Sequence, residues 1–338
     1  MAHMQPPRLI VCAGQELFSS FFSSTRQKRL RRLFDWERDS SGQMTPGLRR
    51  KLLSASALIT TWDSPRFSED LAQLAPQLRV IAHCGGEVKS RFARPLFEQL
   101  TITAAPGPMA RATAELGAAF LLYCARNVDF YRGELRKPSN RIYQALHLHG
   151  STESLTGREV AMIGFGRIGR ALADLMRGFE VNWLVYDPYA PRSLAGQYPV
   201  RFMELKRLLP VAHLLVLTAA LTEETRGILS RENLARLPEG AAVINIARGG
   251  LIDLRALTQE VRRKRLRCAI DVTDPLEPLP VGHPLRTLPG AILTPHVAGS
   301  GRGVRQEIAE VVMNDLERFF LGDSVENRVT TAMLDRMT

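Results

Sequence analysis

The sequence predicts an α/β protein with parallel sheets, and three observations support this fold class. Short apolar runs alternate with amphipathic stretches of helical spacing along most of the chain. Strands that alternate with helices form βαβ units, whose strands are parallel. A glycine-rich turn joins one of the apolar runs directly to a helical stretch. With 338 residues the chain exceeds the ~100–200 residues of a typical domain, so we expect two domains.

The first third of the chain is expected to hold buried strands with helices between them. Its apolar runs lie at 9–12, 57–61, 78–82 and 100–103. The segment 69–76 is amphipathic, and the basic segment 26–34 is predicted to be a helix with one solvated side. A long apolar helix should run from Met109 to about Arg126, followed by a polar stretch of weak periodicity at 131–156.

Beyond this polar stretch the alternation of strands and helices becomes strict. Strands are expected at 159–163, 181–186, 213–218, 241–246, 267–272 and 291–294. A last helix should cover about 304–321. This pattern predicts one further parallel sheet with helices in every connection.

The composition limits the classes of partner. The formal charge is +11, but no nucleic-acid motif accompanies it, so we interpret the basic surface as a solvated face that attracts anionic substrates. No apolar run is long enough to cross a bilayer. The four cysteines are far apart and show no CxxC spacing, which speaks against a metal site and fits a reducing cytoplasm. We therefore expect a cytoplasmic protein with a small-molecule partner, and with no nucleic acid, membrane or metal.

A dinucleotide-binding turn is predicted directly after the strand at 159–163, in the run Gly164-Phe165-Gly166-Arg167-Ile168-Gly169. The first glycine permits a tight turn, the second lets the backbone approach a pyrophosphate, and the third lets helix and strand pack closely. The following helix offers free N–H groups and its positive dipole end to phosphates. The next strand ends in Asp187, whose carboxylate would bind ribose hydroxyls and repel a 2′-phosphate. These features predict a Rossmann-type, doubly wound domain that binds NAD rather than NADP.

Three polar side chains are expected at the carboxyl ends of later strands, where open parallel sheets bind ligands. Arg248 follows the strand at 241–246, Asp271 lies near the end of the strand at 267–272, and His296 follows the strand at 291–294. A guanidinium can bind a carboxylate or a polarised carbonyl with two hydrogen bonds, and a histidine can transfer a proton near neutral pH. Hydride transfer to a ketone requires both functions.

Each of these residues also has a structural interpretation. Arg248 could cap the end of a strand or helix, Asp271 could be a buried hydrogen-bond acceptor, and His296 could be a core histidine. Any one of them alone would favour the structural role. Their convergence at one sheet edge beside a dinucleotide turn favours function.

Further segments match a known family. They are 221–227, Asn245–Asp253, Asp271-Val272 and Thr294–Gly299, in addition to the glycine turn and Asp187. With them the chain resembles the D-isomer-specific 2-hydroxyacid dehydrogenases over nearly its whole length. The resemblance implies that Arg248 binds substrate, that His296 is the acid–base group, and that a carboxylate pairs with His296. It also implies cofactor contacts from Arg167, Ile168, Thr218, Ala219, Thr225, Ile246, Ala247, Asp271 (to the nicotinamide amide) and Gly299.

The chain departs from the family pattern at the carboxylate that pairs with His296. The family has its glutamate one position earlier, where this chain has Leu276, and a proline usually follows that glutamate. Glu277 is followed by Pro278, and loops absorb single insertions, so we favour Glu277 as the catalytic carboxylate. Asp274 is the alternative.

A second departure lies in the loop expected to bind the substrate carboxylate. The family has a glycine-rich loop followed by an aspartate, whereas this chain has His83-Cys84-Gly85-Gly86-Glu87. We expect substrate contacts from Trp62, Cys84, Gly85 and Gly86, together with Arg248 and His296. An inward-pointing Glu87 would repel an anionic substrate, and Trp62 has an ordinary core or surface role as its alternative.

The resemblance implies a smaller, flavodoxin-like α/β substrate domain formed by 1–108 and 300–338, with the NAD-binding Rossmann domain 109–299 inserted into it. It also implies closure of the pair over substrate, and a homodimer formed through the long helix. The expected function is the NAD(H)-dependent interconversion of a small D-2-hydroxy acid and its 2-keto acid. The alternatives are a dehydrogenase of another small anion, phosphite or formate, and an NAD-sensing scaffold or corepressor of the same fold.

Overall fold

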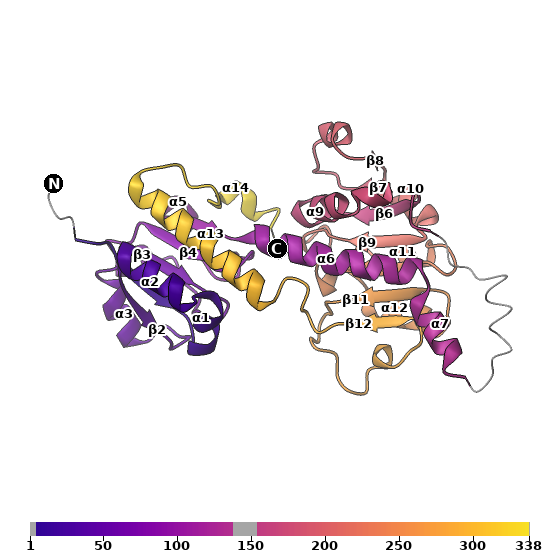
Figure 1. Ribbon diagram of the computed structural model, residues 1–338, viewed down its shortest axis with the longest axis horizontal. Helices are drawn as coiled ribbons and strands as arrows, with labels where there is room; N and C mark the ends of the chain where they lie inside the picture. Colours follow the sequence, from indigo (N-terminus) through magenta and orange to yellow (C-terminus); the bar gives the residue numbers. More distant parts are fainter. Residues whose placement is uncertain (1–4, 138–153, 338) are drawn as a thin grey trace. The chain divides into compact units, whose positions relative to one another are not determined.

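A computed structural model describes residues 5–137 and 154–337 of the chain (Figure 1). The chain divides into two compact units, and we call Met1–Met109 with Ser300–Thr338 the first unit and Ala110–Gly299 the second. The polar stretch predicted at 131–156 falls mostly on 138–153, outside the described residues. In the described part of the chain, no helix is both long and apolar enough to span a membrane.

The first unit contains a five-stranded parallel sheet in the order β2-β1-β3-β4-β5. Its strands are β1 (Arg8–Cys12), β2 (Asp35–Asp39), β3 (Ala57–Thr60), β4 (Val80–His83) and β5 (Thr101–Ala104). This is the flavodoxin-like order, which reverses direction between β1 and β3. The loops after β1, β3 and β4 therefore lie at the sheet edge where such folds bind ligands.

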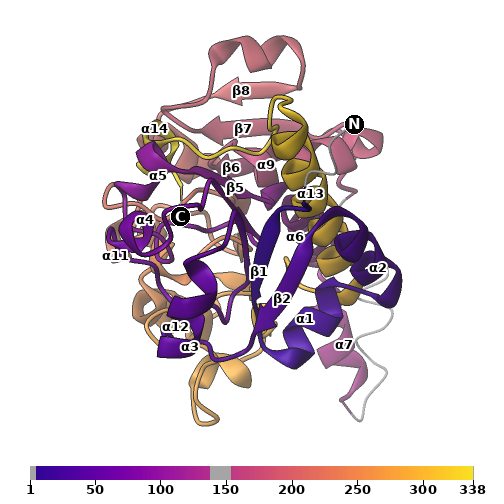
Figure 2. The ribbon, with the colours of Figure 1, turned by 90° about the vertical axis from the view of Figure 1, so that its left-hand side faces the viewer.

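Helices cover both faces of this sheet (Figure 2). One face carries α1 (Gln15–Phe21), α2 (Ser24–Leu33) and α13 (Arg302–Leu321), and the other carries α3 (Pro46–Leu52), α4 (Leu71–Leu74) and α5 (Leu96–Gln99). Strand residues alternate between the faces, so Leu9 packs with α13 whereas Ile10 packs with α3. The C-terminal segment completes this unit, because Val329 donates to the Ile102 carbonyl at 2.8 Å and α14 (Thr331–Leu334) reaches the core.

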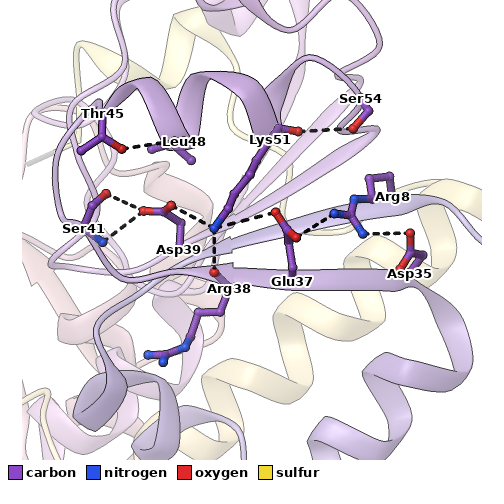
Figure 3. A network of polar contacts seen from close by, with 10 residues as sticks. All are labelled: Arg8, Asp35, Glu37, Arg38, Asp39, Ser41, Thr45, Leu48, Lys51 and Ser54. Carbon is purple, nitrogen blue, oxygen red and sulfur yellow. Dashed lines mark hydrogen bonds and ion pairs between the residues drawn. The ribbon is translucent and has the colours of Figure 1, made fainter.

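The edge strand β2 has no apolar run, and the sequence pattern did not predict it. Its carboxylates form ion pairs with neighbouring basic residues (Figure 3). Arg8 contacts Asp35 at 2.8 Å and Glu37 at 2.9 Å, while the Lys51 ammonium contacts Asp39 at 3.1 Å. An edge strand pairs with only one neighbouring strand, here β1, and can carry charged side chains. It therefore does not need a hydrophobic pattern of period two.

The second unit contains a seven-stranded parallel sheet in the order β12-β11-β10-β9-β6-β7-β8. Its strands are β6 (Glu159–Ile163), β7 (Asn182–Tyr186), β8 (Val200–Phe202), β9 (Leu214–Leu217), β10 (Ala242–Asn245), β11 (Arg267–Ile270) and β12 (Ala291–Leu293). The order reverses between β6 and β9, as in a Rossmann-type doubly wound sheet. The sequence pattern missed only β8 among these strands, a three-residue strand at the sheet edge.

The helices of the second unit pack on both faces of its sheet. On one face α6 (Pro106–Ala125) and α9 (Arg167–Leu175) contribute Leu121 and Leu172 to the core. On the other face α10 (Leu205–Leu208), α11 (Arg231–Ala235) and α12 (Leu254–Arg262) contribute Leu208, Leu234 and Leu257. Among the described residues of this unit, the other elements are α7 (Val128–Leu135) and the 3₁₀ turns Arg177–Phe179, Arg192–Gly196, Leu209–Val211, Gly249–Leu251 and Pro284–Arg286. The α/β fold class with parallel sheets is therefore confirmed.

Candidate functional site

The turn after β6 has the conformation that its first glycine was expected to permit. Gly164 has a φ of +90°, and its N–H donates to the Tyr186 carbonyl at 2.9 Å. A Cβ on Gly164 would lie 2.5 Å from the backbone N and Cα of Ala219, so no larger residue fits. The Thr218 hydroxyl donates to the Gly164 carbonyl at 2.6 Å. The predicted cofactor residues Thr218 and Ala219 thus hold this turn against the end of β9.

The second and third glycines of the turn face different surroundings. A Cβ on Gly169 would lie 2.9 Å from the Gly164 carbonyl oxygen, so Gly169 allows α9 to pack closely on β6. A Cβ on Gly166 would meet no atom within 4 Å, so the space beside this residue is open. Arg167 and Ile168 begin α9 directly after Gly166, and the first N–H groups of a helix have no partner within it. This open cradle at a helix start fits a pyrophosphate.

The carboxylate of Asp187 helps to hold the same turn. One oxygen accepts from the Phe165 N–H at 2.7 Å, and the other accepts from the N–H groups of Tyr189 and Ala190 at 2.9 and 3.0 Å. Each carboxylate oxygen has about two acceptor positions. The oxygen that faces Phe165 therefore keeps one acceptor position for a ribose hydroxyl. Nearby, the Arg192 guanidinium lies over the Phe202 ring, 4.4 Å from the ring centroid.

Two other groups of predicted cofactor residues shape the loops around the turn. The Thr225 hydroxyl accepts from the Thr222 N–H at 2.8 Å and donates to the Ala220 carbonyl at 2.6 Å, which closes the loop after β9. Ile246 and Ala247 are buried at the end of β10. They begin the loop that carries Arg248.

The backbone around Arg248 is fixed by Asn245, which is completely buried. The Asn245 amide donates to the Arg248 carbonyl at 2.9 Å, and its oxygen accepts from the Ala247 N–H at 3.0 Å. The Arg248 guanidinium donates to the Ala247 carbonyl at 2.8 Å. Asn245 is a site residue that the sequence motifs alone did not identify. The available signal was an amide side chain at the last position of an otherwise apolar strand.

The loops after β10 and β11 touch at Gly249. A Cβ on Gly249 would lie 2.2 Å from the Thr273 carbonyl carbon and 2.5 Å from the Asp274 nitrogen. Thr273 in turn donates its N–H to a carboxylate oxygen of Glu277 at 3.0 Å. The position of Glu277 thus depends on the loop that carries Arg248.

His296 and Glu277 form a hydrogen-bonded pair. The His296 Nδ1 lies 2.7 Å from the second carboxylate oxygen of Glu277, and both side chains are partly exposed. In the described part of the chain, Asp274 makes no hydrogen bond or ion pair with His296. The φ of His296 is +54°, an uncommon conformation for a residue with a side chain, which usually persists only where the surroundings enforce it.

Asp271 enforces the conformation of the loop that carries His296. Its carboxylate is almost fully buried and accepts from the Thr294 hydroxyl and from the N–H groups of Val297 and Ala298, both at 2.9 Å. Its carbonyl accepts from the His296 N–H at 2.8 Å. The loop ends at Gly299, the last residue of the second unit. Asp271 therefore has the structural role foreseen as its alternative, and its contact with a nicotinamide stays a prediction.

In the first unit, the loops after β3 and β4 carry the predicted substrate residues. The predicted substrate contact of Cys84 is corrected by the structure. The Cys84 thiol is completely buried in the apolar core, and its N–H donates to the Thr60 carbonyl at 2.7 Å, so neither group is available to a substrate. Gly85 and Gly86 follow it, and Trp62 is 36% exposed. The Glu87 carboxylate accepts from the Ser90 N–H and hydroxyl at 2.8 and 2.5 Å, which ties this charge to its own turn.

The chain is similar to known proteins over most of its length. The family model described as D-isomer specific 2-hydroxyacid dehydrogenase, NAD binding domain, matches residues 118–298. The chain is 30% identical to the glyoxylate reductase of Pyrococcus horikoshii over 283 residues, which cover 82% of this chain and 83% of the relative. A solved structure from Thermus thermophilus shares 30% identity with a TM-score of 0.72, and the match covers 96% of this chain and 100% of that one.

A longer relative is the D-3-phosphoglycerate dehydrogenase of Methanocaldococcus jannaschii, which is 28% identical over 295 residues. The match covers 86% of this chain but only 54% of the relative. The chain thus spans about half the length of the phosphoglycerate dehydrogenases that it matches. The segment matched by the family model contains the glycine turn, Arg248, Glu277 and His296.

Proposed function

Since the chain belongs to the D-isomer specific 2-hydroxyacid dehydrogenase family, we propose that it is an NAD(H)-dependent oxidoreductase that interconverts a small D-2-hydroxy acid and its 2-keto acid. Its second unit is an NAD-binding domain. The observation that carries the proposal is the 2.7 Å pair of His296 and Glu277 at the carboxyl edge of the sheet that also bears the dinucleotide turn.

His296 is the proton donor in the reducing direction. Its Nδ1 faces Glu277, so Nε2 is the ring nitrogen that can form a hydrogen bond with a substrate oxygen. NADH supplies the hydride when it is bound, and the carbonyl oxygen that becomes an alkoxide takes its proton from Nε2. The carboxylate of Glu277 stabilises the imidazolium before the transfer and fixes the orientation of the ring. In the oxidising direction the neutral imidazole accepts the same proton.

Arg248 orients the acid. A guanidinium presents its N–H groups in a planar fork that matches a carboxylate or a polarised carbonyl. The Asn245 amide fixes the backbone on both sides of Ala247, so the guanidinium starts from a defined position. The contact of Gly249 with Thr273 links this position to that of Glu277.

The cofactor preference follows from Asp187. Its free acceptor position suits a ribose hydroxyl, whereas a 2′-phosphate would meet the negative charge of the carboxylate. We therefore assign NAD(H) rather than NADP(H). A cytoplasmic location and a homodimer remain predictions from the sequence.

The test is NADH consumption against a panel of 2-keto acids, with glyoxylate and hydroxypyruvate first because the relatives of this length include a glyoxylate reductase. We expect turnover with at least one acid and slower turnover with NADPH. Oxidation of phosphite or formate without any keto-acid reduction would show that the substrate is a small anion of another class. NADH binding without turnover of any compound would instead favour a scaffold.

A further inference from the structure

Two ring nitrogens in the first unit face the same point of the backbone. A Cβ placed on Gly85 would lie 2.6 Å from the His83 Nε2 and 2.8 Å from the Trp62 Nε1. Trp62 follows β3, and His83 is the last residue of β4, so the two rings come from neighbouring strand ends at the ligand-binding edge of the sheet. A side chain at position 85 would therefore displace one ring or both.

Neither nitrogen has a hydrogen-bond partner among residues 5–137 and 154–337. The Trp62 indole is partly exposed. His83 is only 1% exposed, and the small part of it that solvent reaches includes Nε2. Polar side-chain atoms in such a position are expected to bind either water or a ligand.

The hydrogen-bond pattern of Thr60 determines which His83 nitrogen carries the proton. The Thr60 hydroxyl is completely buried, and its single hydrogen bond within the described residues is with the His83 Nδ1 at 2.9 Å. A buried hydroxyl proton needs an acceptor, so Thr60 donates to Nδ1. The imidazole then carries its proton on Nε2. Burial lowers the pKa of His83 to about 3, which keeps the ring neutral near pH 7.

The charged group that acts on His83 is the Arg91 guanidinium, which itself has the carboxylates of Glu87 and Asp63 and the guanidinium of Arg66 in its vicinity. The Arg91 guanidinium donates to the backbone carbonyls of Ser64 and, at 2.8 Å, of Trp62, which fixes the loop that carries the indole. Asp63 accepts from the Gly14 N–H at 2.8 Å and lies close enough to Arg91 to favour the charged form of its guanidinium. Two neutral donors near a single guanidinium suit a carboxylate, which has one negative charge, better than a phosphate dianion.

We propose that the Trp62 Nε1–H and the His83 Nε2–H form a pair of neutral donors that binds an oxygen of the substrate carboxylate. The proposal rests on the proposed function, because it assumes a 2-keto or 2-hydroxy acid as substrate. It makes Trp62 and His83 specificity-determining residues and Thr60 a positioning residue. It also explains how this chain binds an acid although its loop departs from the family pattern.

The direct test records the NMR signals of the indole N–H groups in the complete chain, which is labelled with ¹⁵N-tryptophan and saturated with NAD. The three tryptophans give three signals, and Trp62→Phe assigns the one from Trp62. On titration with oxamate, an unreactive analogue of a 2-keto acid, the Trp62 signal should move and saturate. The signals of Trp36 and Trp183, whose indoles lie elsewhere, should stay in place. Inorganic phosphate at the same concentration should have little effect.

The outcomes separate this proposal from the proposed function. Saturable oxamate binding by calorimetry with an unmoved Trp62 signal would overturn the donor pair while leaving the enzyme assignment intact. An equal response to phosphate would overturn the commitment to a carboxylate. Absence of keto-acid turnover and of oxamate binding would instead remove the proposed function.

The second test measures kcat and KM of variant enzymes. Trp62→Phe keeps an aromatic side chain but removes the N–H donor. Loss of one hydrogen bond to a charged group should raise KM for the acid about 10-fold, with kcat and the KM for NADH nearly unchanged. Trp36→Phe is the matched control and should leave all three constants unchanged. Thr60→Val frees the His83 proton to move to Nδ1 and should also raise KM, while Thr60→Ser restores it. A Thr60→Val enzyme with the original KM would exclude His83 from the pair.

Discussion

Acid should destabilise the first unit through one buried imidazole. Burial, assisted by the charge of Arg91, lowers the pKa of His83 to about 3, from 6.5 in the absence of the fold. Between these values protons bind the unfolded chain in preference to the folded one, so stability is lost as the pH falls from about 6.5 toward 3. Each pH unit in this window corresponds to about 1.4 kcal/mol, so His83 should cost about 2 kcal/mol at about pH 5.

The perturbation that tests this account is His83→Gln, because glutamine stays neutral at every pH. Urea unfolding near neutral pH and at about pH 5 should show that the original protein loses about 2 kcal/mol more than the variant. His213→Gln is the matched control, since His213 is exposed, and its loss should equal that of the original protein. Equal losses in the original protein and in His83→Gln would refute the reasoning, because the folded protein would then bind the proton as readily as the unfolded one.

Three further predictions concern the second unit. Gly166→Ala should weaken NADH binding about 10-fold without lowering Tm, since the added methyl group meets no protein atom; a lower Tm with unchanged binding would contradict the open cradle. Asp187→Ala should reduce the preference of kcat/KM for NADH over NADPH, and an original enzyme that prefers NADPH would reverse the assignment. Arg248→Lys should lower kcat/KM at least about 10-fold with little change in Tm, whereas a large loss of Tm at unchanged kcat/KM would give Arg248 a purely structural role.

The elements that the sequence predicted correctly are those whose pattern comes from burial on both sides. Strands such as β6 and β10 are continuous apolar runs because helices cover both faces of their sheet. The charged strand β2 was missed because ion pairs and the backbone of β1 replace an apolar pattern there. A three-residue strand such as β8 is too short to show any period.

The candidate site was predictable where residues occur at fixed spacing, and not where a single polar residue acts through its neighbours. The glycine turn and Asp187 follow a spacing set by the path of the backbone around a dinucleotide. Asn245 and His83 are single polar residues at the ends of buried strands, and only their hydrogen bonds distinguish them from core residues. Cys84 was predicted to contact substrate from its place in the loop, but its side chain points into the core.

The central claim is that His296 transfers a proton with Glu277 as its partner, and kcat/KM for keto-acid reduction by three variants tests it most directly. His296→Asn is the cleanest replacement, because asparagine tolerates the φ of +54° at this position. We expect His296→Asn to lose at least about 100-fold, Glu277→Gln about 10-fold, and Asp274→Asn almost nothing, with NADH binding unchanged in all three. An active His296→Asn enzyme, or a loss in Asp274→Asn that Glu277→Gln does not share, would contradict the account.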